Sequence, residues 1–261
     1  MAVTASLPTK SSCAAADYFP SALHEEALAR LAYLAERGEA CGLLLGPGGC
    51  GKSLVLSRFA QHERQRGTAV AAVSSLGASA RELLSAIAAD WRVDVRTSDE
   101  LPQLWQKTTD QLRVLKLEQI PALLLVDDLD EALADGAALI DRLQAFAEGS
   151  GTSLVLIAAC KAGSLELLSP RLLTRAQLRV ELDFWTLEES SGFLNQWLAQ
   201  KADQQEFERQ AMEVLYDLAE GVPRRVRQLA ELTLIAGAGS KGRHLSEEVV
   251  EAAYEELHIG R

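Results

Sequence analysis

One stretch of eight residues has the residue types and the spacing of a phosphate-binding loop. Residues 46–53 read Gly-Pro-Gly-Gly-Cys-Gly-Lys-Ser and match the pattern G-x-x-x-x-G-K-[ST] at every fixed position. Glycines let successive backbone N–H groups point inward and form a nest for anionic oxygens. We expect Lys52 to place its charge between the β- and γ-phosphates and the Ser53 hydroxyl to ligate magnesium. The sequence therefore predicts a site for a nucleoside triphosphate and Mg²⁺.

The expected nucleotide contacts cover the whole loop and one residue beyond it. A short apolar run at 41–45 predicts a buried strand before the loop, and the apolar residues after it predict a helix. The motif requires this order of strand, loop and helix, and the start of the helix directs the positive end of its dipole at the phosphates. The predicted nucleotide-binding residues of this segment are Gly46, Pro47, Gly48, Gly49, Cys50, Gly51, Lys52, Ser53 and Leu54.

A second candidate site follows another apolar run. Residues 122–126 predict a buried strand, and Asp127 and Asp128 come directly after it. A carboxylate at the end of a strand beside the phosphate loop holds magnesium in nucleotide-hydrolysing proteins. We expect Asp127 to take this role and Asp128 to act as the general base on the attacking water.

The elements that must position these residues alternate along the first two thirds of the chain. The predicted strands are residues 41–45, 68–73, 122–126, 152–159 and 177–182. Strands that alternate with helices indicate an α/β fold with a parallel sheet, helices on both faces, and ligand at the carboxyl ends of the strands. From Thr186 onward the pattern is only helical, with helices predicted at 186–200, 205–220, 223–236 and 246–257. We predict three parts: a flexible tail (1–17), a nucleotide-binding core (18–185) and a small helical lid domain (186–261).

The order of four short motifs resembles that of AAA+ P-loop ATPases of the ExeA/GspA type, which are grouped with origin-recognition-like and TniB/MuB-like ATPases. The motifs are residues 18–21 (Tyr-Phe-Pro-Ser), 46–53, 123–128 and 221–224 (Gly-Val-Pro-Arg). The resemblance spans residues 18–257 and implies ATP and Mg²⁺ as the cofactors. The segment Tyr-Phe-Pro at 18–20 has two interpretations, a contact with the adenine base and a hydrophobic staple for the first helix.

The resemblance also implies roles for two arginines. In this family the arginine of G-x-P-R lies at the start of a lid helix and reaches the γ-phosphate, and this role falls on Arg224. The alternative is that Arg224 pairs with a surface carboxylate such as Glu220. An arginine before the last strand acts as a finger on the nucleotide of a neighbouring subunit, and both Arg171 and Arg175 lie there. Spacing from the strand at 177–182 favours Arg175. A finger that acts on a neighbour implies self-association, at least transiently.

Three features depart from the family pattern. Asp128 stands where such ATPases usually have a glutamate, so it is one methylene shorter and could leave the protein a slow switch. The strand at 152–159 leads into Cys160 and Lys161 without the expected Asn, Ser or Thr. The secretion-linked members continue into a transmembrane helix and a peptidoglycan-binding region, and neither is found in this sequence.

Composition restricts the partners and the compartment. The net charge is −11, and the excess of acidic residues is present on both sides of residue 185, which disfavours nonspecific nucleic-acid binding. A local basic cluster exists at Arg224, Arg225 and Arg227. The four cysteines are scattered, which argues against a metal site or a disulfide framework. No apolar run has the length of a membrane span or a signal peptide, so we expect a cytoplasmic protein.

Four functions are compatible with these residues. The first is an ATPase that uses Lys52, Ser53, Asp127 and Asp128 to change the position of its lid for an unidentified protein partner. The second is a nucleotide-dependent switch that binds ATP or ADP and turns over slowly or not at all. The third is a DNA-transaction adaptor of the TniB/MuB kind, which the net charge disfavours. The fourth, a P-loop kinase, fits poorly with a helical lid that carries G-x-P-R.

Overall fold

The computed structural model describes residues 18–38, 41–201, 205–237 and 244–259. The tail predicted for residues 1–17 lies outside the described residues. The described chain forms two compact units, which are treated separately below. The first consists of Leu23–Gly46 and Lys52–Leu182, and the second consists of residues 18–22, 47–51 and 183–259. The tip of the phosphate loop and the residues before the first helix therefore group with the helical C-terminal part of the chain.

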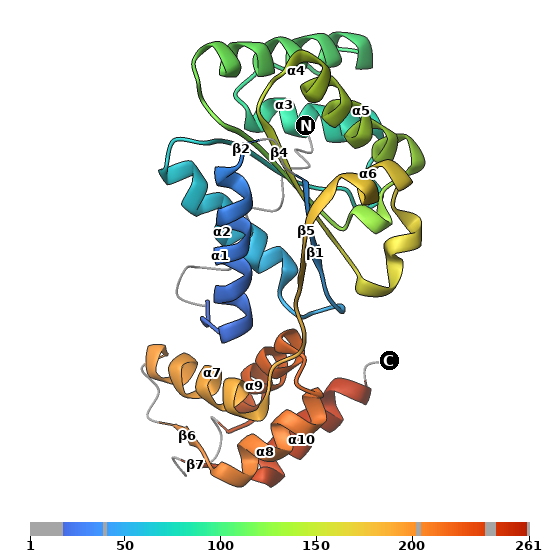
Figure 1. Ribbon diagram of the computed structural model, residues 1–261. Helices are drawn as coiled ribbons and strands as arrows, with labels where there is room; N and C mark the ends of the chain where they lie inside the picture. Colours follow the sequence, from blue (N-terminus) through green and yellow to red (C-terminus); the bar gives the residue numbers. More distant parts are fainter. Residues whose placement is uncertain (1–17, 39–40, 202–204, 238–243, 260–261) are drawn as a thin grey trace. The chain divides into compact units, whose positions relative to one another are not determined.

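The first unit contains a sheet of five parallel strands in the order β2-β3-β4-β1-β5 (Figure 1). The strands are β1 (Cys41–Leu45), β2 (Ala69–Ser74), β3 (Ala122–Asp127), β4 (Leu154–Cys160) and β5 (Ala176–Glu181). Leu45 pairs with Cys160, and Ser74 pairs with Asp127, so the carboxyl ends of these strands meet at one edge of the sheet. This edge is where the phosphate loop and Asp127 were predicted to come together.

Helices cover both faces of the sheet (Figure 1). They are α1 (Ala22–Glu36), α2 (Lys52–Gln65), α3 (Ala80–Asp90), α4 (Leu101–Leu117), α5 (Ala134–Ser150) and α6 (Pro170–Arg175). Figure 1 shows α1 and α2 on one face and α3, α4 and α5 on the other. Every residue of β1, β3 and β4 is buried, as expected for parallel strands that are covered on both sides. These strands are recognisable in the sequence as continuous apolar runs for the same reason.

Local sequence fixes the ends of several helices. Helix α3 begins with a capping box at Ser79 and Glu82, in which the Ser79 hydroxyl accepts from the Glu82 N–H and the Glu82 carboxylate accepts from the Ser79 N–H. Helix α5 ends at Gly151, whose φ of 61° lies in the left-handed region that glycine adopts at little cost. These local features set where α3 begins and where α5 ends.

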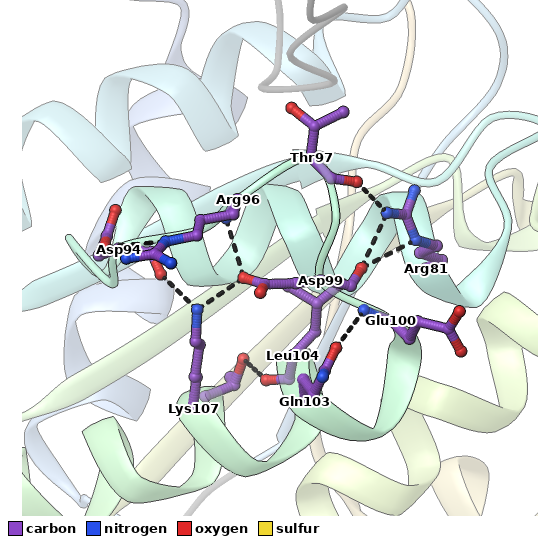
Figure 2. Close-up of polar contacts among 10 residues, drawn as sticks. Arg81, Asp94, Arg96, Thr97, Asp99, Glu100, Gln103, Leu104 and Lys107 are labelled. Atoms are coloured by element: carbon purple, nitrogen blue, oxygen red, sulfur yellow. Dashed lines mark hydrogen bonds and ion pairs between the residues drawn. The ribbon is translucent and has the colours of Figure 1, made fainter.

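A polar network fastens the connection between α3 and α4 (Figure 2). The Arg81 guanidinium donates to the backbone oxygens of Thr97 and Asp99, at 2.7 and 2.8 Å. The Asp99 carboxylate accepts from the Lys107 ammonium at 2.6 Å and from the Arg96 N–H at 2.8 Å. Through these bonds, side chains from both helices hold the intervening loop.

The second unit is mainly helical and has its own apolar core. Its elements are α7 (Leu187–Gln200), α8 (Arg209–Ala219), α9 (Pro223–Gly237), α10 (Glu247–Ile259) and the short parallel pair β6 (Glu206–Phe207) and β7 (His244–Leu245). A capping box at Thr186 and Glu189 starts α7, within one residue of the predicted start of this helix. The prediction of helix from residue 205 was wrong for Glu206–Phe207, because this dipeptide pairs with β7 instead of beginning α8.

An aromatic cluster in the second unit includes the segment that precedes α1. The Phe19 ring meets Trp185 and Phe193 edge to face, with centroids 5.6 and 6.1 Å apart. A Cβ at Gly192 would lie 3.1 Å from the Phe19 ring, so the glycine permits this close approach. The tyrosine before it is held by its backbone oxygen, which accepts from Gln196. Phe19 therefore packs within the aromatic core of the helical unit.

The α/β fold predicted from the alternation of strands and helices is confirmed, with a parallel sheet flanked by helices and a helical C-terminal region. Short elements were missed, namely α6, β6, β7 and the two 3₁₀ segments Leu129–Glu131 and Ala162–Leu167. In the described part of the chain, no helix has both the length and the apolar character needed to cross a membrane.

Candidate nucleotide site

The phosphate loop connects β1 to α2, as the motif requires. Gly49 and Gly51 have φ values of 85° and 107°, in the region that residues with a Cβ rarely adopt. The Lys52 ammonium donates to the Gly46 backbone oxygen at 2.8 Å, and this lysine is only 8% exposed. The lysine side chain is therefore held by the first residue of the motif, while Ser53 at the next position is exposed.

The tip of the loop packs against the start of α9 within the second unit. The Arg224 N–H donates to the Gly49 backbone oxygen at 3.4 Å. A Cβ at Gly49 would lie 2.8 Å from a methyl group of Val222 and 3.5 Å from the Cβ of Arg224. Gly49 is thus required twice, by its backbone conformation and by this close approach.

Asp127, at the carboxyl end of β3, is 2% exposed and lies beside Ser53. Burial raises the pKa of Asp127, and a hydrogen bond with Ser53, the N–H of Asp128 and the charge of Lys52 oppose that rise. The Asp127 Oδ1 accepts from the Asp128 N–H at 3.1 Å. The fold therefore brings together the hydroxyl and the carboxylate that were predicted to hold magnesium.

The donor set at this position suits magnesium. Mg²⁺ prefers oxygen ligands and is held by one or two protein groups together with water and phosphate oxygens. A hydroxyl oxygen and a carboxylate oxygen meet here, and Lys52 is close enough to affect the Asp127 carboxylate. Among the residues that the structure describes, no group of three or more His, Cys, Asp or Glu side chains could hold a metal ion by itself.

Asp128 has a left-handed backbone, with φ 53° and ψ 41°. Aspartate and asparagine tolerate this conformation better than other residues with a Cβ. Burial raises the pKa of Asp128, and the negative charges of Asp127, Glu131 and Asp130 raise it further. A carboxylate with a raised pKa is a stronger base, which is the property that proton abstraction from water requires.

The end of β4 presents a lysine where the family pattern suggested a neutral polar residue. Cys160 is fully buried, and burial raises the pKa of its thiol to about 11. The Lys161 N–H donates to the Asp130 carboxylate at 3.3 Å, and its ammonium forms an ion pair with Glu131. The hydrogen bond to Glu131 and the charge of that residue raise the pKa of Lys161. Lys161 therefore offsets part of the negative charge that follows β3.

Sequence reasoning missed Lys161 and also Ser75. Ser75 is fully buried after β2, and both its backbone N–H and its hydroxyl donate to the backbone oxygen of Asp127, at 2.9 and 2.8 Å. The available signal for both residues was position, because each lies two residues after a predicted strand, at the edge where ligand binds.

The three arginines at the start of α9 have different surroundings. Arg225 forms an ion pair with Glu220, and Arg227 forms one with Glu231 at 3.1 Å. Arg224 is exposed, and its side chain makes no ion pair with any other described residue. Glu220, the alternative partner considered for Arg224, is thus engaged by Arg225.

Arg171 and Arg175 lie on α6, before β5. Arg175 forms an ion pair with Glu148 at 2.7 Å, and its other terminal nitrogen, Nη1, is buried without a hydrogen-bond partner among the described residues. Arg171 is exposed. Because α6 precedes β5, both arginines lie toward the amino ends of the strands, away from the edge that carries Lys52 and Asp127 of the same chain.

Comparisons with known proteins agree with this architecture. The AAA domain family matches residues 35–162. The ORC1 protein of Aeropyrum pernix, solved in complex with DNA, is similar with a TM-score of 0.69 and 21% identity over 92% of this chain and 66% of that one. The ORC2 protein of Aeropyrum pernix, solved as ADPNP-ADP complexes, has a TM-score of 0.69 and 18% identity over 88% of this chain and 66% of that one.

A third similar structure is the RuvB Holliday junction branch migration motor of Thermotoga maritima, with a TM-score of 0.59 and 19% identity over 90% of this chain and 69% of that one. This chain spans slightly less than two thirds of the length of the two ORC proteins. A sequence comparison with curated proteins finds no match. Residues 35–162 thus match the AAA domain model, and the chain has the AAA+ P-loop NTPase fold.

Proposed function

We propose that this protein binds Mg-ATP at the phosphate loop and hydrolyses it, and that the nucleotide state changes the position of its helical unit for a protein partner. The observation that carries the proposal is the meeting of Ser53 with the buried carboxylate of Asp127. These two oxygens come from separate parts of the chain and supply the ligands that a magnesium-bound triphosphate needs. Adenine as the base is inferred from the family resemblance.

The residues of the site divide the work as follows. The Lys52 ammonium and the N–H groups of the glycine loop bind the phosphates, and Leu54 contributes at the start of α2. Asp127 and Ser53 hold magnesium, which neutralises charge on the phosphates when bound. Asp128 orients the attacking water and accepts its proton. Lys161 keeps the carboxylates after β3 compatible with an incoming anion, because it pairs with Glu131.

Two arginines complete the proposal. Arg224 is available to bind the γ-phosphate, since it is exposed while Arg225 and Arg227 are each paired with a glutamate. Arg175 remains the finger that spacing favours, yet its ion pair with Glu148 must open before it can act on a neighbour. Arg171 is exposed and has no such ion pair to break in the described part of the chain, so it is the arginine to substitute first.

The test is steady-state ATPase activity measured over a range of protein concentrations, with Lys52→Ala as the blank. Activity that rises more steeply than protein concentration is expected, because the finger acts between subunits. Arg171→Ala and Arg175→Ala then identify the finger. Mixing a finger variant with a Lys52→Ala chain should restore part of the activity. Tight ATP binding without turnover above the blank would overturn the hydrolysis step.

A slow nucleotide switch is the second candidate function. It is favoured by the left-handed backbone and short side chain of Asp128 and by the buried Cys160 at the end of β4. Both features limit how well an attacking water is positioned. Replacing Asp128 by Glu separates the two functions, since a large gain in turnover identifies a site adapted for slow hydrolysis.

Nucleic-acid binding has less support. The ORC1 structure contains DNA, and the basic cluster at the start of α9 is the feature of this chain that could carry a similar role. Two of its three arginines are already neutralised by Glu220 and Glu231. Retention on DNA that depends on ATP and weakens steeply with salt would restore this function.

A further inference from the structure

Ser75 is a buried serine that lies outside both the phosphate loop and β3. It is hydrogen-bonded to the backbone of Asp127, whose carboxylate is proposed to bind magnesium. Ser75 follows β2, and its N–H and hydroxyl both donate to one acceptor, the backbone oxygen of Asp127, at 2.9 and 2.8 Å. Ser75 is fully buried. The hydrogen bond from the Ser75 hydroxyl joins two residues that are 52 positions apart in the sequence, so it forms only in the folded protein.

The acceptor belongs to the peptide group between Asp127 and Asp128. A peptide group is planar, so fixing its oxygen also fixes the direction of its N–H, which belongs to Asp128. That N–H donates to the Asp127 carboxylate at 3.1 Å. The same plane sets where the left-handed backbone of Asp128 begins. Through one peptide group, Ser75 therefore controls both the orientation of the Asp127 carboxylate and the placement of Asp128.

A second bond fastens the same two segments further along. The Gly77 N–H donates to the Glu131 backbone oxygen at 3.0 Å, and Gly77 has a φ of 61°. Between the two bonds lies Leu76, which is 59% exposed. The turn after β2 is thus tied at both ends to the segment that carries Asp127 and Asp128.

We infer that Ser75 is a positioning residue for the magnesium-dependent step, an inference that rests on the proposed function. Its hydroxyl holds the Asp127–Asp128 peptide group so that the carboxylate of Asp127 faces Ser53 and the carboxylate of Asp128 faces the reacting water. Residues that orient a metal ligand in this way affect metal affinity or activity by about 10- to 100-fold when removed.

The experiment compares Ser75→Ala with the matched control Ser74→Ala. Ser75→Ala keeps the backbone N–H bond to Asp127, so this variant tests the contribution of the hydroxyl. Ser74 is the preceding residue, and its hydroxyl accepts from the Leu76 N–H at 3.4 Å. Binding of a fluorescent ATP analogue is measured in chelator and over a magnesium titration, together with kcat and KM.

For Ser75→Ala we expect unchanged affinity in chelator, a rise of about 10-fold in the magnesium concentration for half-maximal effect, and a comparable fall in kcat with little change in KM. Ser75→Thr, which retains the hydroxyl, should restore the magnesium dependence. Ser74→Ala should behave like the wild type. Equal loss of affinity with and without magnesium would overturn the inference, because it would indicate general loosening of the site.

A readout without nucleotide separates this inference from the proposed function. Amide hydrogen exchange of the segment 122–131 should be at least about tenfold faster in Ser75→Ala than in Ser74→Ala, because the peptide plane has lost a donor. If the wild type shows no magnesium-dependent ATP binding, the proposed function fails while the exchange result still reports on Ser75. Unchanged exchange in Ser75→Ala would overturn the positioning role.

Discussion

Replacing Asp128 by Asn should lower activity and raise the stability of the nucleotide-free protein at the same time. Burial and three neighbouring carboxylates raise the pKa of Asp128, so the ionised form of Asp128 is less favourable in the folded state than in the unfolded state. Asparagine removes the charge and tolerates the left-handed backbone as well as aspartate does. It cannot accept the proton of the attacking water.

The expected sizes follow from these contacts. Loss of a general base lowers kcat by about 10²- to 10⁴-fold. Removal of the Asp128 charge should raise the free energy of unfolding by about 0.5–2 kcal/mol, since residues kept for function commonly reduce the stability of the folded protein. At about 2–4 °C per kcal/mol for a domain of this size, Tm should rise by roughly 1–8 °C. The affinity for ATP should stay within about threefold, because the role proposed for Asp128 is toward the water and not toward the phosphates.

The assay is thermal unfolding in chelator without nucleotide, followed by ATPase measurements. The sign of the pH dependence follows from the raised folded-state pKa of Asp128. The destabilisation by its charge is present above that pKa and is lost as the pH falls toward the unfolded value near 3.8. The difference in Tm between Asp128→Asn and the wild type should therefore be largest near neutral pH and shrink on acidification.

Asp128→Ala is the matched control. It also removes the charge, but the left-handed backbone costs alanine about 1–2 kcal/mol, so its Tm should lie below that of Asp128→Asn. A lower Tm for Asp128→Asn, or equal Tm gains for both variants, would refute the electrostatic reasoning. Unchanged kcat in Asp128→Asn would exclude this residue as the base.

Three further predictions concern the scaffold. The hydrogen bonds from Lys107 and from the Arg96 backbone N–H hold the pKa of the Asp99 carboxyl below its usual value. Asp99→Asn should therefore lower Tm at neutral pH, and the difference from the wild type should disappear on acidification below about pH 4. Gly136→Ala places a Cβ 2.8 Å from the Ala78 backbone oxygen. The overpacking should cost about 1–3 kcal/mol, more than the gain of about 1 kcal/mol from the higher helix propensity of alanine, so urea titration should show a lower free energy of unfolding. Gly149→Ala on the same helix meets nothing within 4 Å and should be neutral or stabilising. The Cys160 thiol, with its pKa near 11, should react with a disulfide reagent at pH 8 only after denaturant is added, which rapid labelling of the native protein would contradict.

Much of the core fold follows from local pattern because burial on both faces makes the central strands recognisable. Runs such as 122–126 are apolar at every position, and the structure buries each of those residues. The capping boxes at Ser79 and Thr186 are local as well, since both partners lie within three residues of each other. Loop geometry also followed from the motif, because Gly49 and Gly51 need no partner to adopt positive φ.

The features that sequence reasoning missed depend on partners far along the chain. Ser75 finds its acceptor 52 residues away, and Lys161 reaches Glu131 across 30 residues. Glu206–Phe207 becomes a strand because β7 lies beside it. None of these pairings has a period or a cap that a sequence displays. The roles proposed for Arg171, Arg175 and Arg224 stay predictions, because they concern a nucleotide and a neighbouring subunit.

The order of the strands has a consequence for how the chain folds. In the sheet, β1 lies between β4 and β5, and its Cys41 pairs with Leu156 and Ala176. During synthesis, β1 and the phosphate loop emerge first, and more than a hundred residues must follow before either neighbour exists. Pairings of such long sequence separation make folding slow and leave apolar strand edges exposed in the meantime. The first strand of the sheet to be made is thus among the last to gain its hydrogen-bonding neighbours.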